Sequence, residues 1–210
     1  MNEPITPSLL TFALTALIIE ITPGPNMGYL AVLSLTRGWR AGAAAVIGVA
    51  LGHAVYGVLA SLGVAAAIDS SKLLYEILRW AGVAYLLWLA WEAWSSEAET
   101  SPEAADGHYG NAQLAFRRGL ITNLLNPKAA VFFVTVVPTF VRPDGSVVAQ
   151  TLLLSGIFVA IATFIHSLIV LLASRMRPLV SNPKRRRPLR RAAAIMLAGI
   201  AIWFAFSSVR

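Results

Sequence analysis

The 210-residue chain has no cysteine and little charge, and both absences narrow what it can be. Without cysteine no disulfide can form, and the redox compartment cannot be inferred. Charged residues make up 13% of the chain, against about 25% in a typical soluble domain. The first residues, "MNEP", contain an acid and no Lys or Arg. They lack the basic start of a secretory signal, so we expect the first apolar run to remain in the mature protein.

Apolar residues are abundant, at 57% of the chain, and several apolar runs exceed the length needed to cross a bilayer. The sequence therefore predicts an all-α integral membrane protein with six transmembrane helices. These are expected at about residues 8–34, 41–68, 72–94, 118–141, 147–173 and 192–209.

The six expected spans divide into two groups of three within one transmembrane domain, residues 1–210. Repeat 1 covers about 8–94, and repeat 2 covers about 118–209. A polar segment, 95–116, is expected to connect them flexibly. Because each repeat has an odd number of spans, the second lies in the membrane inverted relative to the first.

The Lys and Arg residues predict the orientation. Twelve of them fall in the three loops of one side, and only Lys72, Arg142 and Arg210 fall on the other. Basic loops remain in the cytoplasm, so both termini are expected outside. This distribution also accounts for the net charge of +7: the basic loops suit anionic membrane lipid, and no nucleic-acid partner is expected.

Two of the expected spans contain residues that interrupt a helix. Span 1 contains "TPGPN" at 22–26, and span 4 contains "NPK" at 126–128. A proline cannot donate its backbone N–H, so the carbonyls of Ile19, Ile21 and Asn123 are predicted to lose helical partners. Interrupted helices at corresponding places in two inverted repeats are the best pointer in a sequence to a transport site. The alternative is a pair of simple kinks.

A charged residue lies beside each break: Glu20 precedes Pro23 by one turn, and Lys128 follows Pro127. A charge in a membrane helix is costly unless it is paired. If the breaks meet, the two charges could approach each other and bind a zwitterion, with the carboxylate at Lys128 and the restarted helix ends. The alternatives are that Lys128 snorkels to the cytoplasmic interface and that Glu20 is a structural pair or helix cap.

Three other features of the spans suggest contacts. His53 and His166 are the intramembrane histidines and are candidates, with Glu20, for carrying a coupling proton; neither a metal nor another cofactor is expected. Gly48 and Gly52 form a small-xxx-small pair that favours close helix packing. Arg79 and Glu76, three residues apart, are expected to pair on one helical face.

At this point the chain resembles the LysE/RhtB amino-acid exporters of bacterial inner membranes. The resemblance rests on "TPGPNM", "TRGWRAGAAAVIGVALGH", "LRWAGVAYLLWLAW" and "RRGLITNLLNPKAAVFFVTVVPTF". It covers nearly the whole chain, and is weak over 95–116 and after about 175. It implies two inverted halves of three helices and export driven by a proton or cation gradient. It marks six motif positions: Pro23, Gly24, Pro25, Asn126, Pro127 and Lys128. At the position of Asn26, many members of the family have Asp.

Together these arguments predict a secondary exporter of an amino acid or similar small zwitterion, with alternating access around 22–26 and 126–128. The oligomeric state is left open between a monomer and a homo-oligomer. Glu20 and Asn26, together with the six motif positions, are the expected substrate-binding residues. One alternative is a membrane-embedded enzyme, which no nucleophile–base pair or nucleotide loop in the sequence supports. The other is an ion or solute pore.

Overall fold

The computed structural model describes residues 9–63, 72–95, 108–142, 145–179 and 183–207. All of the secondary structure in these ranges is helical, which confirms the predicted all-α class. The α-helices are α1 (Leu9–Ile21), α2 (Pro25–Arg37), α3 (Trp39–Ser61), α5 (Lys72–Ser95), α6 (His108–Leu124), α7 (Pro127–Val131), α8 (Val147–Arg175) and α9 (Pro183–Ser207). A π-helical segment, η2 (Phe132–Val136), and two 3₁₀ turns, η3 (Val137–Phe140) and η4 (Arg177–Leu179), complete the list.

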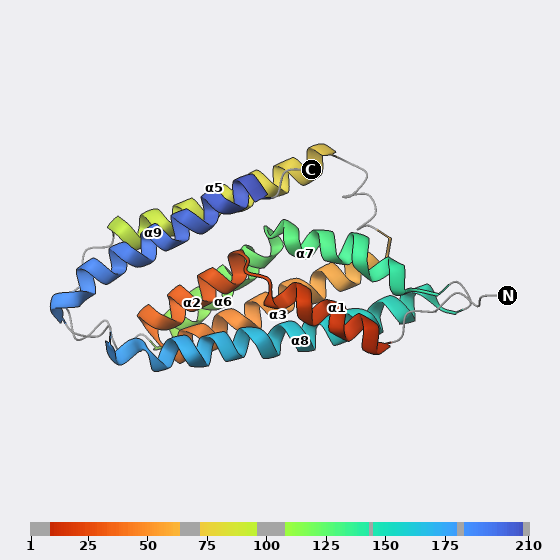
Figure 1. Ribbon diagram of the computed structural model, residues 1–210, viewed down its shortest axis with the longest axis horizontal. Coiled ribbons are helices and arrows are strands. Elements are labelled where there is room, and N and C mark those ends of the chain that lie inside the picture. The colour runs from red at the N-terminus through yellow and green to blue at the C-terminus, as the bar shows by residue number, and fades with distance from the viewer. Residues whose placement is uncertain (1–8, 64–71, 96–107, 143–144, 180–182, 208–210) are drawn as a thin grey trace.

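The helices form a bundle with a helical pair lying along it (Figure 1). In the bundle, α3 packs against both α6 and α8, and α2 packs against α8. The pair consists of α5 and α9, which run antiparallel along each other, and α9 contacts the bundle through α2. In Figure 1, α9 starts at the left-hand end of the molecule, where α8 ends, and runs toward the side on which α1 starts.

Both predicted breaks are present. The axis bends by 58° between α1 and α2, and by 53° between Ala112–Leu124 and Pro127–Phe140. Each helix restarts on a proline, Pro25 or Pro127, in the first turn. Proline suits that position because its missing N–H would have no helical partner there. The local chemistry of proline therefore sets where each helix begins again.

Length and hydropathy identify two single helices as candidate spans, α3 and α8, and four candidates if each bent pair counts as one span. Among the described residues, α9 contributes a shorter apolar stretch, Arg191–Trp203. Helix α5 has 24 residues, but its tryptophans and the charged Glu76, Arg79 and Glu92 lower its hydropathy. The described part of the chain thus has two to four candidate spans by these criteria.

Several predicted boundaries were wrong. Helix α6 begins at His108, inside the segment expected to be a flexible connector, while 96–107 lie outside the described residues. The early turns of α6 are held because Ala115 is buried in the core. Helix α9 begins at Pro183, inside the expected basic loop, because arginine and leucine are good helix formers. Helix α3 ends at Ser61, before the expected 68.

Glycines bring α3 and α6 into backbone contact. A Cβ atom added at Gly48 would collide with the carbonyl oxygen of Phe116, and one at Gly119 with that of Ala45. A Cβ at Gly52 would lie 2.5 Å from the side-chain nitrogen of Asn123. The close packing predicted from Gly48 and Gly52 is confirmed, and we call this contact the α3–α6 seam.

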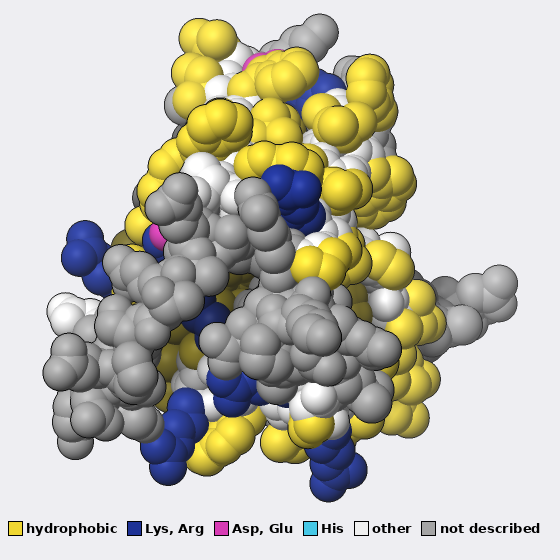
Figure 2. Space-filling view, turned by 90° about the vertical axis from the view of Figure 1, so that its left-hand side faces the viewer, with side chains coloured by type: hydrophobic (Ala, Val, Ile, Leu, Met, Phe, Trp, Pro, Cys, Tyr) yellow, Lys and Arg dark blue, Asp and Glu magenta, His cyan; other side chains and the backbone are white. Residues whose placement is uncertain are grey.

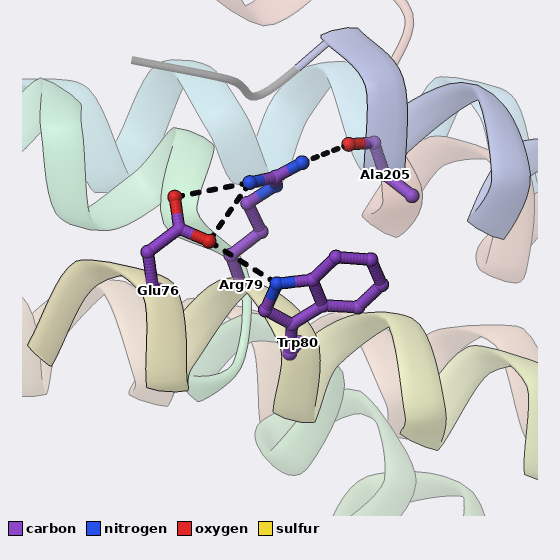
Figure 3. A network of polar contacts seen from close by, with 4 residues as sticks. All are labelled: Glu76, Arg79, Trp80 and Ala205. Atoms are coloured by element: carbon purple, nitrogen blue, oxygen red, sulfur yellow. Dashed lines mark hydrogen bonds and ion pairs between the residues drawn. The ribbon is translucent and has the colours of Figure 1, made fainter. Parts of the chain in front are cut away.

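The predicted pairing of Glu76 and Arg79 is also confirmed, and it joins α5 to α9 (Figure 3). The Arg79 guanidinium donates to both carboxylate oxygens of Glu76, at 3.0 and 2.9 Å, and Trp80 donates to Glu76 at 3.1 Å. Arg79 also donates to the backbone carbonyl of Ala205, in the last turn of α9. A guanidinium at a helix C-terminus is favourable because it meets unpaired carbonyls and the negative end of the helix dipole.

Basic side chains gather at the opposite end of the molecule from the start of α1. Figure 2 shows this end, where Lys and Arg lie among hydrophobic side chains. The exposed arginines that the helix ends place there are Arg37, Arg40, Arg175, Arg177 and Arg191. Residues from two of the three predicted basic loops thus share one end, which agrees with the grouping used to predict the orientation.

Candidate functional site at the helix breaks

The two breaks meet at one small cavity. Its wall is formed by the end of α1, the starts of α2 and α7, and the middles of α3 and α8. The lining residues are Glu20, Gly24, Asn26, Met27, His53, Asn126, Lys128, Ala129 and His166. Seven residues singled out from the sequence are therefore brought together, from segments more than 100 residues apart.

The three prolines of the motifs do not line the cavity. Pro25 and Pro127 are buried at the starts of α2 and α7, whereas Pro23 is exposed. Their contribution is to fix where the backbone bends and which residues then face the cavity. In this structure they shape the site rather than contact its interior.

Lys128 connects the two breaks directly. Its Nζ atom donates a hydrogen bond of 2.7 Å to the backbone carbonyl of Thr22. The side chain passes over Gly24: a Cβ atom added there would lie 3.4 Å from the Cδ and 3.7 Å from the Nζ of Lys128. Lys128 is therefore directed toward the first break, and the snorkelling alternative does not describe it.

Glu20 pairs with a histidine rather than with Lys128. Its Oε2 atom lies 3.4 Å from Nε2 of His166, and both side chains are buried. Among the described residues the charged groups of Glu20 and Lys128 form no ion pair, although both line the cavity. The two charges suggested by the sequence thus share one cavity, and the direct partner of Glu20 is His166 of α8.

The two histidines lie against each other beside Glu20. The rings of His53 and His166 are stacked, with centroids 6.2 Å apart and planes 12° apart. Their Nδ1 atoms are buried and have no hydrogen-bond partner in the described part of the chain. Glu20, His166 and His53 thus form a buried row of groups that can each bind a proton.

Two of the carbonyls predicted to be stranded are in fact satisfied. The Ile19 carbonyl accepts a hydrogen bond from the N–H of Thr22 at 3.2 Å, and the Asn123 carbonyl accepts one from the N–H of Asn126 at 3.0 Å. Each helix tightens its last turn before the break, so that residue i+3 replaces the missing donor. The carbonyl that receives Lys128 is that of Thr22, within the break itself.

The restarted helices also differ. At α7, the side chain of Asn126 accepts a hydrogen bond from the N–H of Lys128 at 3.1 Å and so caps that helix. At α2, the capping position is Gly24, and no side chain caps the helix. Gly24, Asn26 and Met27 all line the cavity, so the positive end of α2 faces its interior. The expectation of two open helix ends therefore holds for α2 only.

The sequence did not identify Asn123 as a site residue. It is fully buried, accepts a hydrogen bond from Asn26 at 2.8 Å and donates one to the Val49 carbonyl at 3.1 Å. These bonds join α2, α6 and α3 behind the cavity. The available signal was a second asparagine, three residues before Asn126, within an apolar run.

The cavity is closed around its charged groups. It offers about 10 Å³ to the centres of water-sized molecules, which is room for about one water. An amino acid cannot fit without movement of the walls. In the described residues, no group of three or more His, Asp or Glu side chains is arranged to hold a metal ion.

The comparison with known proteins matches this arrangement to one family. The model of the LysE type translocators matches residues 17–208. The chain belongs to the LysE type translocator family. The match spans both breaks and all of the described helices from the middle of α1 onward, so the family assignment covers the complete site.

Two of the relatives of this LysE type translocator described here carry names for efflux. A homoserine/homoserine lactone efflux protein of Salmonella typhi is 28% identical over 190 residues, covering 90% of this chain and 92% of that protein. A leucine efflux protein of Enterobacter sp. (strain 638) is 30% identical over 156 residues, covering 74% of each chain. An uncharacterised membrane protein of Vibrio cholerae is 29% identical over 174 residues, covering 83% and 84%. No solved structure matches the chain.

The family and the apolar helices together identify a multi-pass membrane protein. The exposed large side chains of its helices are consistent with lipid contact, since apolar surface facing hydrocarbon carries no penalty. They include Leu14, Ile18, Trp91, Phe164 and Phe206.

Proposed function

We propose that this translocator exports an amino acid or a similar small zwitterion across the bacterial inner membrane, using a proton or cation gradient. The observation that carries the proposal is the single cavity where Lys128, the open start of α2 and Glu20 meet at two broken helices. The names of the relatives, for homoserine, homoserine lactone and leucine efflux, support a solute of this size and charge.

The charges of the cavity fit a zwitterion. The substrate carboxylate would lie at the N-terminus of α2 and the Lys128 ammonium, where a positive charge and unpaired N–H groups coincide. The substrate ammonium would lie at Glu20. One acid and one base leave the cavity neutral overall when both are charged, which favours a solute with no net charge.

Coupling would use the row Glu20, His166 and His53. Asn26 stands where many members of the family have Asp, and a carboxamide does not ionise at physiological pH, so it cannot carry a coupling proton. The 3.4 Å separation of Glu20 and His166 allows one proton to pass between them. A substrate ammonium arriving at Glu20 would compete with that proton, which is how the two fluxes would be linked.

The topology we propose is six spans in two inverted repeats, with both termini outside. Three observations support it: the similar bends of 58° and 53°, the equivalent order of helices after each break, and the basic end in Figure 2. Alternating access would then open the closed cavity to one side at a time.

Counterflow in proteoliposomes tests the proposal. Vesicles loaded with unlabelled homoserine or leucine should transiently accumulate the labelled compound, and an imposed pH gradient should drive net flux. Lys128→Met should reduce both. If the internal concentration of labelled solute never exceeds its equilibrium value, the protein is a pore. Chemical conversion of the solute by detergent-solubilised protein would indicate an enzyme.

A further inference from the structure

A second, larger cavity lies next to the site. It has a volume of about 390 Å³, within the range of about 300–1,000 Å³ that is usual for small-molecule pockets. Its wall is formed by the end of α3, by η2 and η3, and by the start of α8, and it is mostly apolar. Ala60, Phe133, Val137 and Thr151 are among the lining residues. We call it the outer vestibule, since these elements face the side on which both termini are expected.

Phe133 lies between the vestibule and His53 of the site. Phe133 lines the vestibule, and its ring centroid is 6.3 Å from that of His53, which lines the small cavity. Phe133 is fully buried. Passage from one cavity to the other therefore requires this ring to move.

Two further rings complete the barrier. Phe158 lies edge-on to both Phe133 and His53, at 5.3 and 5.0 Å between centroids. Tyr56 stacks on Phe133 at 6.0 Å, and its hydroxyl donates to the Leu124 carbonyl at 2.7 Å. Leu124 is the last residue of α6 before the break, so the aromatic barrier is connected to the backbone of the site.

The backbone that carries Phe133 is irregular. After only five residues of α-helix in α7, the chain continues as the π-helical η2 and then the 3₁₀ turn η3. Such changes of helical hydrogen bonding are frequent at functional sites and hinges. This segment can shift the Phe133 ring without unfolding a long helix.

We propose that Phe133, supported by Tyr56 and Phe158, is the gate between the charged cavity and the outer vestibule. The direction of passage, outward, rests on the proposed function. The gate itself rests on the geometry of the two cavities. Its closed state keeps the charged cavity out of contact with the outside, and its opening leads the solute into an apolar exit.

The absence of cysteine in the chain allows a clean accessibility experiment. Ala129→Cys places a thiol in the small cavity, and Ala60→Cys places one in the vestibule. Each is combined with wild-type Phe133, with Phe133→Ala, or with Phe132→Ala as the control. Phe132 is buried and stacks on Phe158 at 3.9 Å, but lines neither cavity. A small, membrane-impermeant methanethiosulfonate is added to intact cells and to inside-out vesicles.

The thiol at position 60 should react from outside in every background. The thiol at position 129 should react slowly from outside in the wild-type background and about tenfold or more faster with Phe133→Ala, because that truncation empties the space between the cavities. Phe132→Ala should leave its rate unchanged. Phe133→Val serves as a milder variant if Phe133→Ala does not fold, and should give an intermediate rate.

Equal rates for the Phe133 and Phe132 variants would overturn the gate, as would a thiol at position 129 that already reacts as fast as the one at position 60. Reaction of position 60 from the inside-out face alone would move the vestibule to the cytoplasmic side. Labelling needs neither solute nor gradient. A negative result here therefore leaves amino-acid export standing, and failure of the counterflow experiment leaves the barrier standing.

Discussion

The Lys128 ammonium donates a hydrogen bond of 2.7 Å to the Thr22 carbonyl, across 106 residues of sequence. It is a direct link between the two helix breaks. The bond satisfies a backbone carbonyl in the break, outside both α1 and α2, and it holds a positive charge beside the open start of α2. A single residue thus has a structural role and the proposed binding role.

Replacing Lys128 should affect both roles. Lys128→Met leaves the Thr22 carbonyl without its donor, so we expect a loss of about 1–3 kcal/mol in the free energy of unfolding and a higher half-saturation constant for export. Lys128→Arg should retain part of the stability and part of the affinity for the exported solute. Thermal unfolding in detergent measures the loss of stability, and transport in vesicles measures the half-saturation constant. Arg117→Met, at an exposed position, is the control.

Combining Lys128→Met with Glu20→Gln tests whether the charges of these two residues depend on each other. Either single change leaves one uncompensated charge in the cavity, whereas the double change leaves it neutral. The double variant should therefore lose less stability than the sum of the singles. Strict additivity would mean that Glu20 depends on His166 alone.

Glu20 and His166 should govern coupling. Glu20→Gln removes a group that can release a proton, so net export driven by a pH gradient should fall to the rate without a gradient. Exchange of labelled for unlabelled solute should partly survive because it moves no proton. His166→Gln should have the same selective effect. Both fluxes are measured in the same vesicles, and equal loss of both would assign the pair to binding instead.

Asn123 should be the most sensitive polar residue outside the cavity. Asn123→Leu keeps the size of the side chain but removes its bonds to Asn26 and to the Val49 carbonyl. Each buried group left unpaired costs about 1–3 kcal/mol. The adjacent Thr122→Val is a matched control, because the buried Thr122 bonds only within α6, to the Arg118 carbonyl. A similar loss of unfolding temperature for both variants would contradict the role given to Asn123.

The proposed orientation can be read from two single cysteines in the described loops and helix ends. Gly145→Cys, just before α8, should react with an impermeant thiol reagent applied to intact cells. Met176→Cys, just after α8, should react only after the membrane is opened. The opposite pattern would reverse the assignment made from Lys and Arg.

The sequence predicted the breaks well because proline and glycine act locally: Pro25 and Pro127 start helices wherever the rest of the chain lies. The partner of Glu20 was not predictable in the same way. Which face of α1 meets α8 depends on the direction of the bend and on how several helices pack. Asn123 was missed for a related reason, since its two bonds reach α2 and α3. The starts of α6 and α9 were misplaced because polar composition alone does not exclude a helix.

The α3–α6 seam has a consequence for movement. It joins a helix of the first proposed repeat to a helix of the second, with Gly48 and Gly119 allowing each backbone to touch the other. Two helices in such backbone contact form a rigid pair: they can tilt together but cannot slide past each other without collision. The two proposed repeats would then not move as independent blocks. In the proposed transport cycle, the displacement that opens the cavity would fall instead on the short half-helices α1 and α7, whose ends at the breaks carry Glu20 and Lys128.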